Sequence, residues 1–411
     1  MPSCKPSAIH KPWLNTGFFL FATFLLNFGI FVFSPLLVDI QRSLHLSFLE
    51  ISCVPVALGI GRLLGNAPAG IWVDRAGHYS VFTFSICLTL LGVATAGSAS
   101  SGGMLLAGCV LLGLGHAFKV VAGLSILMEK YRYSRWGSVI NLYEFIAISS
   151  TMISVVVAGK LALLYGWRSA FVFAFGMAVA SLAVVQFVIR WQAGWQGYPE
   201  NEPLLPAPVE VEVAQDAASG ARSACHSVEA AILGGSFLLS YGYNGVFQTL
   251  LPLRSGLELG LDAGQIALVM TGGYMANILL LIPAGWLGDR IGKAHTFLGG
   301  LLLLLLGAVS FGAADTLFLM GLCSILLGSS FCTWMMPAAM LGARADRRRR
   351  GKVLGLYRCV IDVGNICGPL TLGVIAGYQG YRTAGTVFAG LVAGILLWFL
   401  KRIPLTSKNS R

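Results

Sequence analysis

Three basic side chains stand inside long apolar stretches of the sequence, where charges are rare. His116 and Lys119 lie one helical turn apart near the middle of one stretch, and Arg62 lies near the middle of another. Ionisable groups in such stretches face a protein interior or a water-filled cavity, and they mark functional sites. Together these three would form a cationic cavity that attracts an anionic solute, such as a carboxylate, a phosphate ester or a metal chelate.

Acidic groups in similar stretches allow two interpretations of this cavity. In the first, Glu144 or His116 carries a coupled proton. In the second, the charges are structural: Arg358 pairs with Asp362 four residues later, and Glu144 pairs with Lys119 or with an arginine. We favour pairing for Arg358 and Asp362. We favour solute binding for Lys119, because its own stretch holds no acidic residue at helical spacing.

Uncharged side chains complete the set of candidates. Trp334 holds the position equivalent to Lys119 in the second copy of an internal repeat, and it would form the opposite wall of the cavity. A buried amide can bond two helices together, and for Asn27 this is as reasonable as contact with the solute. The nine cysteines show no paired spacing, so we predict neither a metal site nor a disulfide framework. The neutral polar candidates are Asn27, Tyr243, Asn244 and Gln248.

The stretches that hold these residues are long enough to cross a membrane. Of the 411 residues, 56% are hydrophobic and only 11% are charged, and the mean hydropathy is +0.78. That is too little charge to cover a surface in water. A transmembrane helix needs about 20 apolar residues, and helix is expected because an open strand cannot satisfy its backbone in lipid. Twelve such runs lie near 17–38, 51–72, 81–99, 104–128, 138–165, 170–189, 230–251, 266–287, 296–314, 317–341, 353–378 and 383–400.

Basic residues between these runs predict the orientation of the chain. If both termini are cytoplasmic, the inside segments hold twenty Lys and Arg, the outside segments five and the spans three, which accounts for all 28. Such an excess on one side is typical of the cytoplasmic side of a membrane. In this interpretation the arginine run 347–350 anchors the chain at the lipid headgroups and is not a nucleic-acid site. We therefore expect a multi-pass protein of the cytoplasmic (inner) membrane, with the lipid bilayer and no nucleic acid as partner.

The chain contains two copies of one unit. The Pro-Ala-Gly segment at 68–70 recurs at 283–285, and Tyr143 recurs as Tyr357. In the first run of each copy, Asn27 recurs as Asn244 at nearly the same offset along the chain. Ordered matches of this kind indicate two parallel six-helix repeats, with a substrate site at their interface near the middle of the membrane.

A single long polar stretch separates the two copies. Residues 191–228 are rich in proline and acidic side chains, and we interpret them as a flexible cytoplasmic linker. The predicted organisation is therefore an N-terminal six-helix bundle at 1–190, this linker, and a C-terminal six-helix bundle at 229–411. The predicted fold is an all-α membrane protein of 12 transmembrane helices in two pseudo-symmetric bundles.

One loop carries a recognisable motif in both copies. The sequence G-I-W-V-D-R-A-G-H at 70–78 resembles the G-x-x-x-D-R-x-G-R motif of the major facilitator superfamily, and G-W-L-G-D-R-I-G-K at 285–293 repeats it. The resemblance covers the whole chain. It implies that this loop latches the cytoplasmic ends of the two halves in one state and releases them in the other. His78 replaces the usual arginine, which would weaken the first latch or make it pH-sensitive, or is a tolerated change at the headgroups. The latch residues are Gly70, Asp74, Arg75, Gly77, Gly285, Asp289, Arg290 and Gly292.

The resemblance to the 12-span drug/proton antiporter branch of that superfamily is partial. Its fourth span usually reads R-x-x-x-G-x-G, whereas here Cys109 precedes Gly113 and Gly115, so the arginine linked to proton movement is absent. The Gly-Pro pair of its fifth span is replaced by Ser154 and Val155. The antiporter function is therefore possible but not the leading hypothesis.

These features predict a secondary active transporter of a small organic, anionic solute, working by alternating access and coupled to protons. The alternatives are a proton-antiport efflux pump for drugs or metabolites and, from another class, a non-transporting sensor that keeps the fold. We expect no enzyme activity and no cofactor, because the sequence has no Walker loop and no HExxH or serine–lysine arrangement. A monomer is expected.

Overall fold

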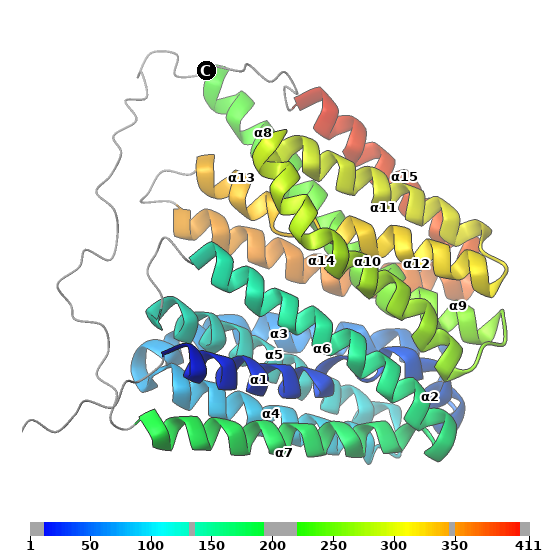
Figure 1. Ribbon diagram of the computed structural model, residues 1–411. Helices are drawn as coiled ribbons and strands as arrows, with labels where there is room; N and C mark the ends of the chain where they lie inside the picture. The colour runs from blue at the N-terminus through cyan, green and yellow to red at the C-terminus, as the bar shows by residue number, and fades with distance from the viewer. Residues whose placement is uncertain (1–11, 131–135, 193–219, 345–349, 403–411) are drawn as a thin grey trace, which may run out of the picture.

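The computed structural model describes residues 12–130, 136–192, 220–344 and 350–402, and within these ranges the chain forms helices and no strand (Figure 1). The predicted linker 191–228 lies mostly outside the described residues, and its described ends belong to α7 and α8. The first half contains α1 (Pro12–Phe31), η1 (Ser34–Leu36), α2 (Leu37–Leu44), α3 (Phe48–Ala76), α4 (His78–Gly97), α5 (Gly102–Lys130), α6 (Trp136–Tyr165) and α7 (Trp167–Gln192). The second half contains α8 (Gly220–Gly242), η3 (Tyr243–Leu250), α9 (Leu251–Leu257), α10 (Ala263–Arg290), α11 (Lys293–Ala313), α12 (Leu317–Phe331), α13 (Met336–Arg344), α14 (Arg350–Gln379) and α15 (Tyr381–Arg402).

The twelve predicted apolar runs all correspond to helical segments, which confirms the prediction of an all-α membrane fold. In the described part of the chain, eleven segments are long and apolar enough to cross a bilayer as single units. The run predicted near 230–251 is not among them, and the structure builds it from the end of α8, the π-helix η3 and the start of α9. A π turn is wider than an α turn, so it interrupts the regular helix without ending the helical path.

Two further spans are interrupted near the centre of the molecule. Residues 32–33 and the 3₁₀ turn η1 separate α1 from α2, and Pro35 stands in the first turn of η1. Proline fits there because the first amides of a helix have no intrahelical partner. In the second half, residues 332–335 separate α12 from α13. Side chains on these breaks, such as Trp334, can therefore face the interior between the halves.

The two halves form neighbouring bundles of similar construction. In Figure 1, α1–α7 occupy the lower part of the view and α8–α15 the upper part. Each half begins its second span with a complete capping box, Ser47 with Glu50 at the start of α3 and Asp262 with Gln265 at the start of α10. Ser47 and Asp262 occupy equivalent positions of the sequence repeat, at the offset that relates the two Pro-Ala-Gly segments. The two copies therefore also share the side-chain capping that begins their second span.

Within each half, glycines allow helices to approach closely. A Cβ added at Gly113 of α5 would meet the backbone of α3 at Gly61, and one added at Gly328 of α12 would meet the backbone of α10 at Gly273. Small residues at such crossings are typical of membrane helix packing, where dispersion contacts stabilise the pair.

The substitution Gly328→Ala is expected to destabilise the protein, because the added methyl group would press on the backbone of Gly273 and force α10 and α12 apart. Overpacking of this kind costs about 1–3 kcal/mol. Thermal unfolding of the purified protein in detergent measures the effect. The matched control is Gly321→Ala on the same helix, where a Cβ would meet nothing within 4 Å. Equal melting temperatures for the two variants would contradict the packing described here.

The halves meet most closely at one end of the molecule, which we call the closed end. It holds α2 and α9, and a Cβ added at Gly256 of α9 would contact Val38 of α2. Arg42 donates to the carbonyl of Gly256 at 3.4 Å, and the Phe48 and Tyr381 rings meet edge to face at 5.7 Å. Glycine also permits close approach of α3 to α14 at Gly373 and of α6 to α10 at Gly159.

The opposite end carries the two motif loops, and we call it the latch end. Gly77 and Gly292 begin the helices that follow these loops with φ of 78° and 100°, a left-handed conformation that favours glycine. A Cβ added at Gly70 or Gly285 would meet nothing within 4 Å. Among the described residues, these two glycines at the latch end are therefore not packed against a neighbour, unlike Gly256 at the closed end.

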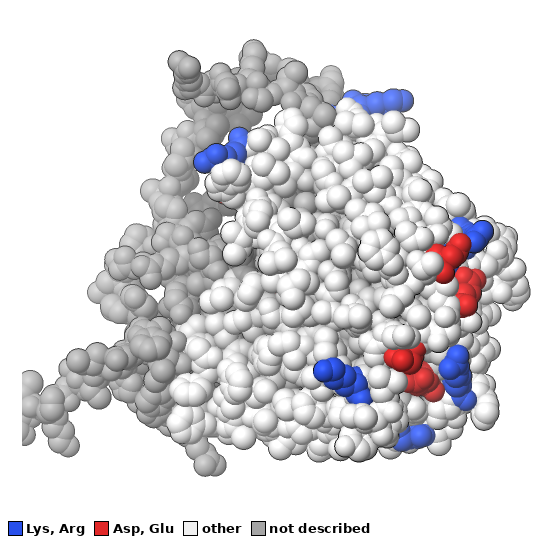
Figure 2. Space-filling view, turned by 45° about the vertical axis from the view of Figure 1, so that its right-hand side comes forward, with Lys and Arg blue, Asp and Glu red and all other residues white. Residues whose placement is uncertain are grey.

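The outer surface suits a lipid environment. Figure 2 shows wide areas without a charged side chain, and the charges visible on this face gather towards its margins. Large apolar side chains such as Ile282 and Phe318 are 74% and 78% exposed. Wide exposed apolar surfaces mark contact with a membrane or a partner. They are expected on a multi-pass membrane protein.

Candidate functional site

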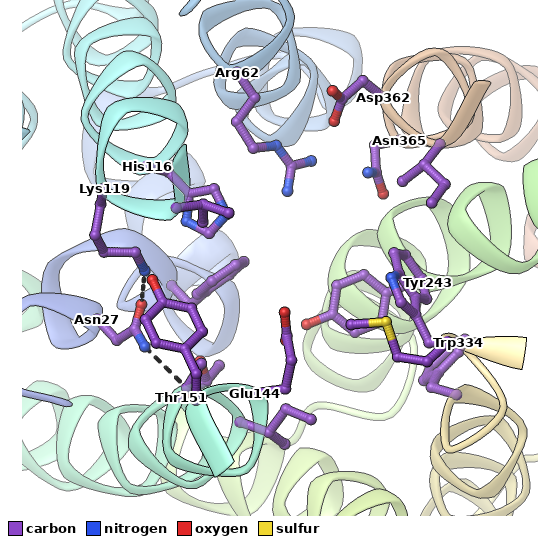
Figure 3. A pocket seen from close by; sticks show the side chains of 18 of the residues that line it. Asn27, Arg62, His116, Lys119, Glu144, Thr151, Tyr243, Trp334, Asp362 and Asn365 are labelled. Carbon is purple, nitrogen blue, oxygen red and sulfur yellow. Dashed lines mark hydrogen bonds between the residues drawn. The ribbon is translucent and has the colours of Figure 1, made fainter. Parts of the chain in front are cut away.

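A cavity lies between the halves, with its floor towards the closed end. Its empty space, including the part open to solvent, is about 1170 Å³. Nine of the eleven candidate residues line it, and Figure 3 shows most of them converging on one space. The lining candidates are Asn27, Arg62, His116, Lys119, Glu144, Tyr243, Trp334, Arg358 and Asp362.

Lys119 is bound to Asn27 at one side of this cavity. The Lys119 side chain is 1% exposed, and its ammonium group donates to the amide oxygen of Asn27. The amide nitrogen of Asn27 in turn donates to the carbonyl of Ala147 at 3.5 Å. Asn27 thus joins α1 to α5 and α6, and it also lines the cavity. The amide satisfies one donor of the ammonium, and among the described residues no carboxylate lies within 4 Å of it.

Arg62 has spare hydrogen-bonding capacity. Its side chain is 8% exposed, and its Nε and Nη2 atoms are buried without a hydrogen-bond partner in the described part of the protein. The close approach of α3 to α5 at Gly61 fixes the segment that carries it. In Figure 3 the guanidinium group points into the open space at the centre of the cavity. A buried donor left unsatisfied is costly, so an acceptor that enters the cavity would find a prepared partner.

Glu144 and His116 also face this space. In Figure 3 the Glu144 carboxylate projects from α6 towards the centre of the cavity. Among the described residues it makes neither a hydrogen bond nor a salt bridge within 4 Å, so the alternative in which Glu144 pairs with Lys119 or with an arginine is not found here. His116 packs edge to face on Phe31 at a centroid distance of 5.9 Å, and its Nδ1 is buried without a partner.

Arg358 and Asp362 do not form the pair predicted from their spacing. No salt bridge within 4 Å joins them in the described structure. Asp362 accepts a hydrogen bond of 2.6 Å from Asn66 of α3, which joins the two halves across the cavity wall. The prediction considered only neighbours on one helix, whereas a closer donor comes from a helix 296 residues away in sequence.

The charges of the cavity do not balance. Three basic groups line it, Arg62, Lys119 and Arg358, against the two carboxylates of Glu144 and Asp362. With His116 neutral, the ionised cavity carries one excess positive charge. In surroundings of low dielectric constant such an imbalance acts over several ångströms.

Two candidates lie outside the cavity lining. Gln248 is buried in η3 and accepts a hydrogen bond of 2.5 Å from Ser34 in the other half. Its amide nitrogen donates to the hydroxyl of Tyr243 at 2.9 Å and to that of Tyr274. Asn244 donates to the backbone carbonyl of Asn365 at 3.2 Å. Both amides bond helices together, and the Gln248 group seals the floor of the cavity.

Several lining residues were not predicted from the sequence. They are neutral residues of spans that also contain many similar side chains, so no charge distinguishes them. The sequence feature that they share is a polar side chain in an apolar run. A single residue of this kind does not identify a cavity. The polar ones are Asn66, Tyr143, Thr151, Tyr274, Asn277 and Asn365.

The latch residues lie away from the cavity, at the latch end. The sequence placed them in a loop, but Gly70, Asp74 and Arg75 belong to the end of α3 and Gly285, Asp289 and Arg290 to the end of α10, so only Gly77 and Gly292 lie between helices. Asp74 and Arg75 are exposed at the end of α3. Arg290 lies over the ring of Trp286 with its guanidinium carbon 3.9 Å from the centroid, a cation–π contact within the last turns of α10. Among the described residues, Asp74, Arg75 and Asp289 form no salt bridge within 4 Å. Nor do any three His, Cys, Asp or Glu side chains of the described ranges gather to hold a metal ion.

Comparison with known sequences identifies the family. The profile of the Major Facilitator Superfamily matches residues 19–258 and 232–411. A "Multidrug resistance protein B homolog" of Mycobacterium tuberculosis is 29% identical over 160 residues, which covers 37% of this chain and 29% of that protein. The "Probable nitrate transporter NarT" of Staphylococcus haemolyticus is 22% identical over 359 residues, which covers 85% of this chain and 86% of that protein. The chain spans 25% to 29% of the length of the first curated relatives that it matches.

Solved structures share the fold. A bacterial homologue of the human lysosomal transporter Spinster, in an inward-facing and occupied conformation, superimposes with a TM-score of 0.73 at 14% identity, covering 96% of this chain and 97% of that one. The sequence profile identifies the same family that the doubled motif resembles. The two bundles with a cavity between them fit that family's fold. This chain is a multi-pass membrane protein that belongs to the Major Facilitator Superfamily.

Proposed function

We propose that this protein is a secondary active carrier of a small organic anion, coupled to protons and working by alternating access. The observation that carries the proposal is the uncompensated positive charge of the cavity, with two buried donor atoms of Arg62 left without a partner. A carboxylate or phosphate group would accept from such a guanidinium in a bidentate manner. The relative named as a probable nitrate transporter, which aligns along most of this chain, is also named for an anion.

Glu144 is our candidate for the proton carrier. It is a carboxylate without a hydrogen-bonding or ion-pair partner in the described structure, and it faces the same space as the basic groups (Figure 3). A proton on Glu144 would raise the excess positive charge of the cavity from one to two, which favours the entry of an anion. Proton and anion would therefore bind together, so the charges support cotransport.

The closed and latch ends suggest how access alternates. We assign the latch end to the cytoplasm of a cytoplasmic membrane, because the basic loop residues concentrate on the side of the motif loops. The described structure would then be open inward, and the opposite state would separate α2 from α9 while the motif loops hold the other end together. We propose that the monomer is sufficient for this motion, since the cavity is built from one chain.

A second candidate function is efflux by proton antiport. The partial match to a multidrug resistance protein homologue favours it. In that case Glu144 would exchange a proton for the solute, and uncharged or cationic compounds would bind as well as anions. A non-transporting sensor is the third possibility, and it would bind a ligand without moving it.

A transport assay separates these functions. Purified protein is screened by thermal shift against carboxylates, phosphate esters and chelated metals, and each hit is tested for counterflow and for pH-driven uptake in proteoliposomes. Uptake of an anion that follows an imposed proton gradient is expected. Binding without counterflow would indicate a sensor, and expulsion of neutral or cationic compounds in exchange for protons would indicate an efflux pump.

The substitution Lys119→Ala is expected to weaken the binding of any anionic hit about thirtyfold. A unit charge about 8 Å from the ligand contributes about 2 kcal/mol at an effective dielectric constant of about 20. Calorimetric titration measures the affinity, and Lys160→Ala is the matched control because Lys160 is exposed on α6 outside the cavity. If Lys119→Ala left both binding and transport of the anion unchanged, the cationic-cavity proposal would be wrong.

A further inference from the structure

The wall of the cavity formed by η3, α10, α12 and the break at 332–335 is aromatic. Tyr243 meets Phe331 edge to face with centroids 5.0 Å apart and Trp334 with centroids 5.9 Å apart. Behind them, Phe247 meets Tyr274 at 5.1 Å and Phe331 at 5.6 Å. Four of these rings line the cavity, and we call the group of Tyr243, Tyr274, Phe331 and Trp334 the aromatic wall.

Two of the three basic groups that would attract an anion stand on a different wall. Arg62 and Lys119 belong to α3 and α5 of the first half, whereas Arg358 and every ring of the aromatic wall belong to the second half. In Figure 3, Tyr243 and Trp334 lie across the open space from Lys119 and His116. A ligand that fills the space between the walls would present a charge on one side and an apolar surface on the other.

The rings of the aromatic wall are held in place by neighbours, so the wall is preformed. The hydroxyl of Tyr243 accepts from Gln248, as does that of Tyr274. The backbone carbonyl of Trp334 accepts a hydrogen bond of 2.8 Å from the hydroxyl of Tyr357. These rings meet mostly edge to face, an arrangement that a further planar ring can extend. An aliphatic ligand would bury the same area without that electrostatic match.

We propose that the preferred substrate is an aromatic monocarboxylate whose carboxylate binds Arg62 and whose ring packs on the aromatic wall. The inference rests on the proposed function, since it specifies which organic anion is carried. One carboxylate has two oxygens, which is enough to accept from the two unpartnered donor atoms of Arg62. The planar fork of a guanidinium matches a carboxylate, and ring packing on the opposite wall selects the body of the molecule.

The test compares matched ligands by calorimetric titration of the purified wild-type protein. The series is phenylacetate, cyclohexylacetate, acetate, phenyl phosphate and phenylalanine. Phenylacetate is expected to bind at least about tenfold more tightly than acetate because its ring is buried. It is expected to bind between about two- and tenfold more tightly than cyclohexylacetate because aromatic contacts add to burial.

Variants of the aromatic wall complete the test. Trp334→Leu should remove most of the preference of the protein for phenylacetate over cyclohexylacetate, and Trp334→Phe should retain it. Neither change alters the backbone carbonyl that Tyr357 binds, and thermal unfolding of both variants checks that the fold is kept. An unchanged preference in Trp334→Leu would overturn the assignment of the ring to this wall.

The other outcomes are distinguishable. Equal affinities for phenylacetate, cyclohexylacetate and acetate would overturn this inference and leave the anion transporter intact. If phenyl phosphate bound more tightly than phenylacetate, the preferred substrate would be a phosphate ester. If phenylalanine bound more tightly than phenylacetate, Glu144 would bind the ammonium group of an amino acid. Either result would overturn the inference. Failure of all anions to bind, together with binding of neutral or cationic compounds, would overturn the proposed function itself.

Discussion

A disulfide between residues 38 and 256 is expected to abolish transport completely, and reduction is expected to restore it. The double substitution Val38→Cys with Gly256→Cys places the two thiols where α2 and α9 touch at the closed end, since a Cβ on Gly256 would already contact Val38. Disulfides need Cβ atoms within about 4.5 Å of each other. If access alternates, this end must open in every cycle, and a covalent bond there would hold the carrier in one state.

The measurement is pH-driven uptake in proteoliposomes before and after reduction, in a background whose nine native cysteines are replaced by serine. The matched control is Gly300→Cys with Thr333→Cys. These residues also touch, but both belong to the second half, so a bond between them should leave transport intact. Full transport by the oxidised 38–256 variant, with the bond verified by mass spectrometry, would show that the closed end does not open.

The substitution Arg62→Gln is expected to have opposite effects on ligand affinity and on the stability of the empty protein. Removing one partner of a buried charged hydrogen bond costs about 2–5 kcal/mol of binding, which is a loss of at least about thirtyfold in affinity for the anion. The empty protein should become more thermostable, because a buried guanidinium with unpaired donors is replaced by a neutral amide. Arg62→Lys keeps the positive charge but loses the planar pair of donors. Its affinity for the anion should therefore lie between those of the wild type and of Arg62→Gln.

A matched buried arginine separates function from structure. Arg254 is 1% exposed, and it binds Glu258 at 2.8 Å and Asp315 at 3.0 Å at the closed end. Arg254→Gln should therefore lower the melting temperature and leave the affinity for the anion unchanged. If Arg62→Gln behaved like Arg254→Gln, with lower stability and normal binding, Arg62 would be a structural residue and not the anion site.

The charged part of the candidate site was predictable from the sequence, for a physical reason. Charges are so costly in lipid that Lys119, Arg62 and Glu144 stand out in apolar runs without any knowledge of the structure. The structure places all three around one cavity. The doubled motif loop and the repeat similarly predicted paired bundles, because the constant offset between the two copies is visible in the residues themselves.

The partners of these groups were not predictable. Asp362 binds Asn66, and Gln248 binds Ser34, across separations of 296 and 214 residues. Helical spacing predicts contacts within one helix, but the rotation and depth of neighbouring helices decide which amide meets which oxygen. The irregular backbone of η3 was not predictable either. A π turn depends on the packing around it, and the amino-acid composition of an apolar run does not reveal it.

The bond between Ser34 and Gln248 has a consequence for the ancestry of the chain. At the offset that relates the first runs of the two copies, the counterpart of Ser34 is Leu251 and that of Gln248 is Phe31. A symmetric dimer of two identical first halves would have Phe31 in place of Gln248, and a dimer of two second halves would have Leu251 in place of Ser34. Neither homodimer could form this bond at the floor. The polar seal of the floor thus requires two diverged copies, which gives a physical advantage to a duplicated and fused gene over a single half that dimerises.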